Sequence, residues 1–296
     1  MMLIEKLSAR WMSAFFMHLF TSREYRQREL AKVELRSANR VAIAIFVSAL
    51  VVCCAFASAQ SSAGAGSLQD PNAVSAVNLA LTSMGGTSSF TSIQDTTVTG
   101  QASAGSPPNS VGQITWMTIG MSIRCATVPP TGNSIYTDQN GAGYVEDASG
   151  NVAPMDSRLA LTLFPFHLPG AVLLNLLNAA NETLSVVADT GSTPNIVHVR
   201  SLVQMSDPTL TPVTQQDWYV DMNTGLPTRV DYYLPNITNS ALDGTATILF
   251  TSWQKTPTIL VPQTIQMLTN GTQVSTVTLG IPQFNQGLSA TIFQLP

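Results

Sequence analysis

The sequence predicts an α+β protein in which an antiparallel sheet carries most residues and an N-terminal signal or anchor segment precedes the domain. Three observations support this prediction. Short runs rich in Thr, Val and Ile recur between Gly, Pro and Asn, one apolar stripe has helical spacing, and an uncharged apolar stretch follows a basic N-terminal region. With 45% apolar and 10% charged residues, the 296-residue chain can bury a core of ordinary size.

The N-terminal part of the chain has the pattern of an export signal. The basic extension at residues 1–40 carries eight Lys and Arg against four Glu, and the uncharged, apolar residues 41–59 follow it. Small residues at Ala57 and Ala59 precede the polar Gln60, which predicts signal cleavage after Ala59. The domain would then be periplasmic or secreted.

An uncleaved membrane anchor is the alternative interpretation of residues 41–59. This segment of nineteen residues approaches the roughly 20 residues that a helix needs to cross a bilayer. The N-terminal segment would then contact the inner membrane and hold the domain outside the cytoplasm. In either case, the small and polar residues 60–69 predict a flexible tether, and residues 70–296 form the β-rich domain.

The charge and cysteine content of the domain exclude two possibilities. Residues 41–296 carry five Lys and Arg against thirteen Asp and Glu. Binding of nucleic acid needs several clustered cations to neutralise phosphates, so we expect no nucleic-acid partner. Cys125 is the single cysteine after residue 54, so no disulfide can form within the domain.

Three helices are predicted from capping residues and apolar spacing. An N-cap aspartate followed by proline opens residues 70–86, apolar residues then recur at spacings of three and four, and two glycines end the helix. Residues 156–163 form a short helix that begins at another aspartate. Residues 169–178 form a third helix with leucines around much of its circumference, so it needs more than one apolar partner.

Short strands, typical of an antiparallel sheet, are predicted through the rest of the domain. The expected strands are residues 93–99, 111–119, 122–128, 133–137, 215–221, 226–234, 246–253, 259–268, 272–279 and 288–295. Turn residues at 222–225 and at 270–271 predict two hairpins. Asp221 and Arg229 flank the first hairpin, and we expect them to form an exposed cross-strand pair.

Three sequence features together resemble the LolA-like superfamily of periplasmic lipoprotein carriers. The first is Ala-Leu-Thr-Ser-Met-Gly-Gly at residues 80–86, at the end of the opening helix and before a strand that stops at Gly100. The second is the hairpin Trp-Tyr-Val-Asp-Met-Asn-Thr-Gly-Leu-Pro-Thr-Arg-Val at residues 218–230. The third runs from Phe-Thr-Ser-Trp and Leu-Val-Pro within residues 250–262 to a terminal strand containing Phe293.

This resemblance implies a more specific fold for residues 70–296. It implies a strongly curved antiparallel sheet, a half barrel, whose concave apolar face is plugged by helices. In the carriers of this family the cavity accepts acyl chains. The acidic, cation-poor domain departs from those carriers. The resemblance is therefore carried over only to the fold and the ligand class.

Catalytic and metal-binding patterns are missing from the sequence. No Gly-x-Ser-x-Gly motif marks a serine nucleophile, and His167 and His198 have no helical metal-ligand spacing. A nucleophilic Cys125 would need a base and an electropositive setting, and no pattern near it in the sequence indicates them. We therefore expect no enzymatic activity, no metal site and no cofactor.

Apolar side chains are the remaining candidates for a binding site, because small-molecule sites are concave and mostly apolar. The candidate residues for contact with a hydrophobic ligand are Trp116, Phe164, Phe166, Leu173, Leu176, Leu177 and Trp218. One hypothesis is an exported envelope protein that binds a lipid or another acyl-bearing ligand in a half-barrel cavity. The alternative is a non-enzymatic interaction or sensor module that contacts an envelope protein partner and has a filled core.

Overall fold

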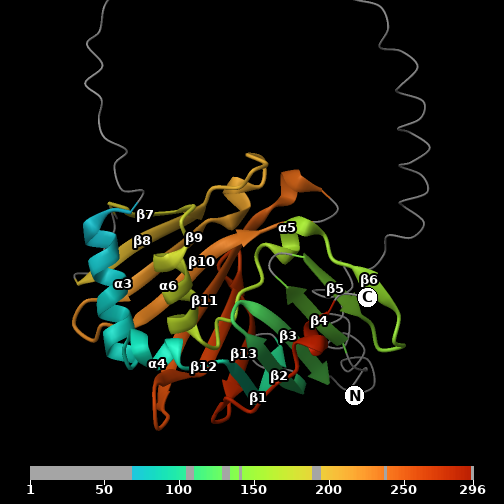
Figure 1. Ribbon diagram of the computed structural model, residues 1–296. Helices are drawn as coiled ribbons and strands as arrows, with labels where there is room; N and C mark the ends of the chain where they lie inside the picture. Colours follow the sequence, from blue (N-terminus) through green and yellow to red (C-terminus); the bar gives the residue numbers. More distant parts are fainter. Residues whose placement is uncertain are drawn as a thin grey trace, which may run out of the picture. The chain divides into compact units, whose positions relative to one another are not determined.

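The computed structural model describes residues 69–104, 110–128, 134–139, 142–188, 195–236 and 239–294 (Figure 1). The predicted basic extension, the signal or anchor segment with its cleavage at Ala59, and residues 60–68 of the tether lie outside these ranges. Within the described ranges, no helix combines the length and the apolar character needed to cross a membrane.

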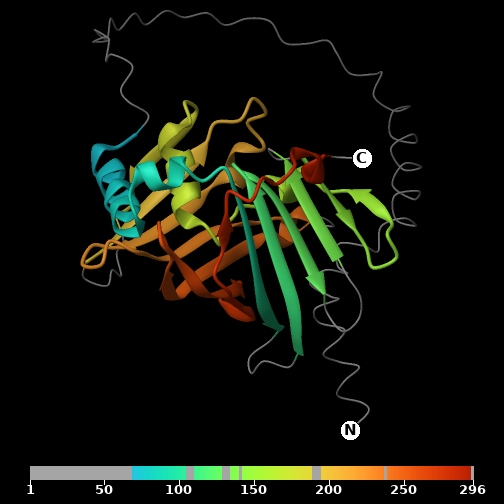
Figure 2. The ribbon, with the colours of Figure 1, turned by 60° about the horizontal axis from the view of Figure 1, so that its bottom comes forward.

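The strands of the described residues form one open antiparallel sheet (Figure 2). They are β1 (Asp95–Ala104), β2 (Ser110–Ile119), β3 (Ser122–Val128), β4 (Ser134–Gln139), β5 (Ala142–Glu146), β6 (Val152–Pro154), β7 (Glu182–Val186), β8 (Ile196–Val203), β9 (Gln216–Asp221), β10 (Pro227–Leu234), β11 (Gly244–Lys255), β12 (Leu260–Thr269), β13 (Thr272–Leu279) and β14 (Gln283–Phe284). The order is β6-β5-β4-β3-β2-β1-β13-β12-β11-β10-β9-β8-β7, and β14 pairs with β1. β6 and β7 end this order without pairing to each other. This arrangement agrees with the predicted α+β class.

The helices that the structure describes are short and few. They are α3 (Pro71–Met84), α4 (Thr87–Thr91), α5 (Ser157–Ala160) and α6 (Pro169–Asn178), with the 3-10 helices η1 (Thr211–Thr214), η2 (Ser240–Leu242) and η3 (Ala290–Phe293). α3 contacts β7, β8, β9 and β12, so one helix crosses several strands of the sheet (Figure 1).

The ends of α3 confirm the predicted capping. The side chain of Asp70 accepts a hydrogen bond from the Asn72 N–H at 2.8 Å, and Pro71 occupies the first turn. Gly85 ends the helix at φ +128°, where a side chain would be strained. A Cβ there would also lie 2.9 Å from the carbonyl oxygen of Thr258, so only glycine lets the helix end approach the β11–β12 turn.

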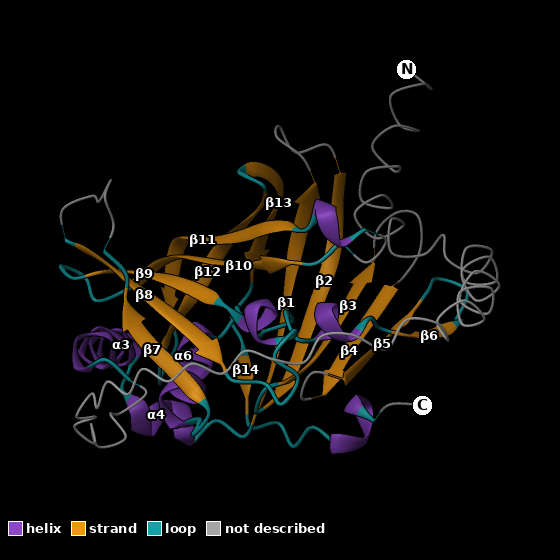
Figure 3. Cartoon of the chain, turned by 90° about the horizontal axis from the view of Figure 1, so that it is seen from above, coloured by secondary structure: helices purple, strands orange, loops and turns teal. Residues whose placement is uncertain are grey.

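The third predicted helix, α6, has the bounds expected from the sequence. It contacts α3 on one side and α4 on another, and it also touches β7 (Figure 3). These several neighbours explain why leucines surround the helix. The second predicted helix is shorter than expected, because α5 ends at Ala160. Thr162 donates its hydroxyl to the Leu159 carbonyl, and Pro165 then disfavours helix in the residue before it.

Both predicted hairpins are present. β9 pairs with β10 around residues 222–225, and β12 pairs with β13 around Asn270 and Gly271. Asn270 and Gly271 have φ values of +48° and +77°, which are typical of the two-residue turn that joins antiparallel strands.

The predicted C-terminal strand at residues 288–295 is wrong. The chain forms η3 there, and the only strand after β13 in the described residues is the short β14. Asp95 explains the difference, because its carboxylate accepts hydrogen bonds from the N–H groups of Gln286, Gly287 and Leu288. These donors are therefore not available to a strand ladder. η3 contacts β3 and β4 (Figure 2). Its residue Phe293 is buried.

The structure differs from the sequence prediction at other strands too, among them β1, β7 and β8. β1 does not stop at Gly100 but continues to Ala104, and Gly100 pairs with both Ile114 and Leu279. A Cβ at Gly100 would lie 2.5 Å from the Thr278 carbonyl oxygen, so this glycine allows close strand approach rather than ending the strand. β7 and β8 were not predicted, because polar residues such as Glu182 and Ser201 interrupt their apolar pattern.

Candidate functional site

A groove of about 260 Å³ lies between α4, α6 and the adjacent ends of β1 and β2. Its polar rim includes the side chains of Gln94, Asn175 and Asn178. The apolar residues that line it are Phe90, Ile93, Met121, Leu168, Ala171 and Leu174. The groove is slightly smaller than the ~300–1,000 Å³ typical of ligand pockets, so it suits one chain of a ligand better than a bulky molecule.

Two threonines lie side by side in the wall that the sheet gives to this groove. Thr96 on β1 pairs with Thr118 on β2, and their exposed fractions are 0% and 2%. The Thr96 hydroxyl has no hydrogen-bond partner among the described atoms. Leaving such a group unpaired costs about 1–3 kcal/mol, so the wall of the groove includes a residue with a buried polar atom that lacks a partner.

A buried histidine precedes the groove residue Leu168. His167 stacks on Trp116 of β2, with ring centroids 5.1 Å apart and planes 14° apart. It is 3% exposed, and neither ring nitrogen has a partner among the described atoms. Burial lowers the pKa of His167 to about 3, so the ring is uncharged at neutral pH.

Cys125 of β3 completes this group of side chains. It pairs with Trp116 across the sheet, and burial raises the pKa of its thiol to about 12, although the hydrogen bond with Trp116 acts in the opposite direction. A thiol with this pKa stays protonated at neutral pH and is a poor nucleophile. Within the described residues, no three His, Cys, Asp or Glu side chains are grouped as metal ligands.

The seven residues predicted to contact a ligand belong to one apolar core. Their places in that core differ: Phe166, Leu173, Leu176 and Trp218 are buried in it, whereas Trp116, Phe164 and Leu177 are half-buried and pack against it. None of the seven lines the groove. Their role as ligand contacts stays a prediction, and the groove adds residues that the sequence did not single out.

One signal in the sequence could have pointed to the groove. α6 has apolar residues around its circumference, and Leu173 and Leu176 account for only one side of the helix. Ala171 and Leu174 lie three positions apart on another side, where they face the groove. When a helix also carries apolar residues on sides that do not face the core, those sides lie in a second apolar environment.

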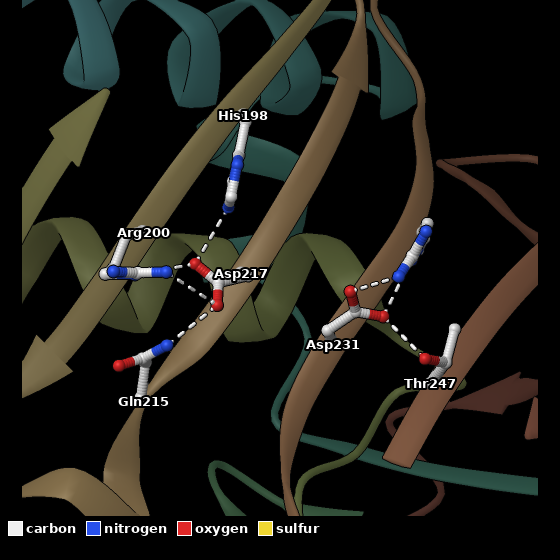
Figure 4. A network of polar contacts seen from close by, with 7 residues as sticks. His198, Arg200, Gln215, Asp217, Asp231 and Thr247 are labelled. Atoms are coloured by element: carbon white, nitrogen blue, oxygen red, sulfur yellow. Dashed lines mark hydrogen bonds and ion pairs between the residues drawn. The ribbon is translucent and has the colours of Figure 1, made fainter. Parts of the chain in front are cut away.

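A separate polar network lies on the sheet face away from the core (Figure 4). The Asp217 carboxylate contacts His198 Nε2 at 2.8 Å, Arg200 Nε at 2.8 Å and Gln215 Nε2 at 2.8 Å. Burial alone would raise the pKa of Asp217, but these hydrogen bonds outweigh it and lower the pKa below its ordinary value. Because its charges pair with one another, this network braces neighbouring strands.

The strand register does not place Asp221 opposite Arg229, as the predicted cross-strand pair requires. A register shift between Pro227 and Arg229 places Arg229 opposite Tyr219, and its guanidinium lies 4.8 Å from the centre of that ring. Arg229 Nε donates instead to Asp231 at 2.7 Å, and Asp231 also accepts from the Thr247 hydroxyl at 2.6 Å (Figure 4). The irregular strand pairing therefore decides which carboxylate the arginine meets.

Three solved structures of related shape come from different bacteria. They are an outer membrane lipoprotein-sorting protein domain from Vibrio parahaemolyticus (12% identity, TM-score 0.49), a DUF1329 family protein from Desulfovibrio piger (14%, 0.48) and a LolA superfamily protein from Nitrosomonas europaea (11%, 0.49). Each comparison covers 75% of this chain and 97% of the other chain. No protein-family model and no curated protein matches the sequence.

Two of these structures are described as a lipoprotein-sorting domain and a LolA superfamily protein. With identities of at most 14% and TM-scores below 0.5, the likenesses carry no conclusion about a ligand or a partner.

Proposed function

We propose that this chain is an exported envelope protein that binds a lipid or another acyl-bearing ligand in the groove between α4, α6 and β1–β2. The sheet acts as a half barrel, and α3 and α6 cover its concave apolar face. One observation carries the proposal: a groove with mainly apolar walls contains the buried, unpartnered hydroxyl of Thr96. Apolar walls with a few convergent polar atoms are the usual composition of a small-molecule site.

The energetics favour a hydrocarbon chain in this groove. Each methylene that leaves water for an apolar wall contributes about 0.8 kcal/mol. The size of the groove fits part of a single chain, and the neighbouring rim amides of Asn175 and Asn178 offer polar contacts near the opening. The leader pattern at residues 1–59 supports a location in the cell envelope.

The proposed role is non-catalytic. The thiol of Cys125 is held protonated, and His167 has neither a carboxylate nor a nucleophile as a hydrogen-bond partner among the described atoms. His198 does contact a carboxylate, but it lies on the other face of the sheet from the groove. General acid–base chemistry needs such groups within hydrogen-bond reach of a bound substrate.

Filling the groove tests the proposal. The wild-type protein should bind the uncharged dye N-phenyl-1-naphthylamine with a rise in fluorescence, and dodecanol should displace it. Ala171→Trp places a large ring in the groove and should weaken dye binding roughly tenfold or more, since losing the burial of two or three methylenes has that effect. Ala241→Trp, at an exposed position of η2, is the matched control and should bind as wild type.

Circular dichroism and thermal melting of each variant separate loss of binding from loss of fold. Leu174→Trp serves as a second groove variant if Ala171→Trp melts early. Wild-type protein that binds no dye, or groove variants that fold and bind it normally, would contradict the proposed site.

The filled-core alternative has one specific observation in its favour. Leu173 and Trp218 are 0% exposed, so much of the predicted cavity is occupied by side chains of the protein itself. An interaction or sensor module of this kind would contact an envelope protein and take up no acyl ligand. Co-purification of a stoichiometric envelope protein, together with absent dye binding, would favour this function.

A further inference from the structure

The groove runs along one side of α6. The residues that this helix and its N-cap give to the lining recur at spacings of three and four, and they are Leu168, Ala171, Leu174, Asn175 and Asn178. With a rise of about 1.5 Å per residue, this stripe is about 15 Å long and reaches the last residue of the helix. A ligand that fills the groove therefore lies beside the C-terminal end of α6.

The C-terminal end of α6 favours positive charge. The last carbonyl groups of a helix have no partner within it, so this end carries a partial negative charge. α6 has no basic side chain in its last turn. The Leu177 carbonyl accepts instead from the side-chain amide of Gln69 at 3.2 Å, and this amide is uncharged. A positive head group near Asn178 is therefore stabilised, and a negative one is repelled.

The one charged side chain among the described residues that line the groove is a carboxylate, that of Asp95. It accepts hydrogen bonds from the backbone N–H groups of residues 286–288 at 2.8, 2.8 and 3.1 Å. These donors are neutral, so they stabilise the negative charge without cancelling it. The wall of the groove therefore adds negative charge to that of the helix end.

The cations of the domain lie away from the groove. All Lys and Arg of residues 41–296 are described, and none of them lines the groove: Arg124, Arg158, Arg200, Arg229 and Lys255. Arg124 follows the lining residue Met121 most closely along the chain. Because its neighbour Cys125 packs against the core, Arg124 points to the other face of β3, where it contacts the Tyr144 hydroxyl at 3.3 Å. A carboxylate in the groove would therefore meet no positive side chain among the described residues.

The polar side chains of the rim do not discriminate between charges by themselves. The amides of Gln94, Asn175 and Asn178 carry both an acceptor oxygen and two N–H donors, so they can bind an anion or a cation. The charges around these amides therefore decide which head group is favoured. All of those charges are negative.

We propose that the groove selects its ligand by the charge of the head group, and that it prefers a single chain with a cationic head group to a fatty acid. This inference rests on the proposed binding of an acyl ligand and names the ligand class. The chain lies along α6 against the apolar wall, and the cationic group lies at the rim near Asn178.

Three ligands with alkyl chains of matching length test the selection. Displacement of N-phenyl-1-naphthylamine is measured at pH 8 with dodecyltrimethylammonium, dodecanol and laurate, each below its micelle concentration. Dodecyltrimethylammonium cannot donate an N–H, so it isolates the effect of charge. Wild-type protein should bind it roughly five- to tenfold more tightly than laurate, with dodecanol between the two.

Salt should weaken this preference. Raising the salt concentration from about 0.01 M to about 1 M shortens the screening length from about 30 Å to about 3 Å. The ratio between the affinities for dodecyltrimethylammonium and laurate should then fall towards one.

A lysine at the rim should reverse the selection. Asn178 is exposed, and a lysine at a helix C-terminus favours the fold, so Asn178→Lys adds a positive charge to the groove without disturbing α6. The ratio between the two charged ligands should fall to about one or below, because laurate gains an ion pair and the cation is repelled. Dodecanol affinity should stay within about twofold of the wild type.

Ala241→Lys is the matched control, because it adds the same charge at an exposed position of η2 outside the groove lining. It should keep the wild-type ratio. Thermal melting of both variants verifies that they fold.

The outcomes distinguish the two proposals. Equal affinity of the wild type for the two charged ligands, or an unchanged ratio in Asn178→Lys, would contradict selection by charge, while displacement by dodecanol would leave the proposed function standing. A ratio that Ala241→Lys lowers as much as Asn178→Lys would assign the preference to the overall charge of the domain and would also contradict it. If dodecanol displaces no dye, the proposed function itself is wrong.

Discussion

Glu182→Gln is expected to produce a protein whose stability rises steadily between pH 4.5 and 6.5, by up to about 1.4 kcal/mol per pH unit. The rise belongs to His167, whose pKa is lowered by burial from 6.5 to about 3. Between these values the unfolded chain takes up a proton that the folded chain does not, so each step to higher pH favours the folded state.

In the wild-type protein Glu182 opposes this rise. Burial raises the pKa of Glu182 from 4.5 to about 7, so between these values the folded chain holds a proton that the unfolded chain has lost. Stability from this group is present below pH 4.5 and is lost as the pH rises towards 7. Between pH 4.5 and 6.5 the rise in stability from His167 and the fall in stability from Glu182 largely cancel.

Urea unfolding at several values of pH checks this balance. His167→Phe, which keeps a ring against Trp116, should give the opposite result to Glu182→Gln, with stability that falls as the pH rises through the same interval. A Glu182→Gln profile as flat as that of the wild type would contradict the burial of these two side chains in the folded protein.

Trp218→Ala is expected to lower the free energy of unfolding by about 3–5 kcal/mol. Trp218 is 0% exposed and packs between Phe166 and Phe250, with ring centroids at 6.0 and 6.3 Å. Its indole N–H donates to Gln216 Oε1 at 2.9 Å, so the substitution also leaves a buried acceptor unpaired. A loss of this size is a large part of the stability of an ordinary domain.

Urea denaturation at pH 7 measures this loss. Trp218→Phe retains an aromatic ring but removes the donor, so it should cost less, about 1–3 kcal/mol. Met222→Ala, at a residue that is 40% exposed in the β9–β10 turn, should change stability by less than about 0.5 kcal/mol. A Trp218→Ala protein that loses under 1 kcal/mol would contradict the packed core.

Local chemistry in the sequence was sufficient to predict several elements. The capping of α3 by Asp70 and Gly85 depends only on neighbouring residues, and so does the turn at Asn270-Gly271. The C-terminal strand was mispredicted because a residue far away in the sequence, Asp95, binds the backbone there. Long-range contacts of this kind leave no local pattern.

The candidate site also has a part that the sequence predicted and a part that depends on long-range packing. Size and apolarity identified residues of the core, such as Leu173 and Trp218, and the structure gathers them in one cluster. Which side of α6 faces open space depends on how that helix packs, so Ala171 was not predicted. The unpartnered hydroxyl of Thr96 was equally unpredictable, because it depends on how the neighbouring elements pack around it.

The two outermost strands of the open sheet have a consequence for self-association. Unpaired strand edges invite other chains to add on by backbone hydrogen bonding. β6 is three residues long and ends in Pro154, which has no N–H to donate. Beside β7, the Asp70 N–H donates to the Leu184 carbonyl at 2.7 Å. Both rims of the open sheet therefore resist edge-to-edge polymerisation.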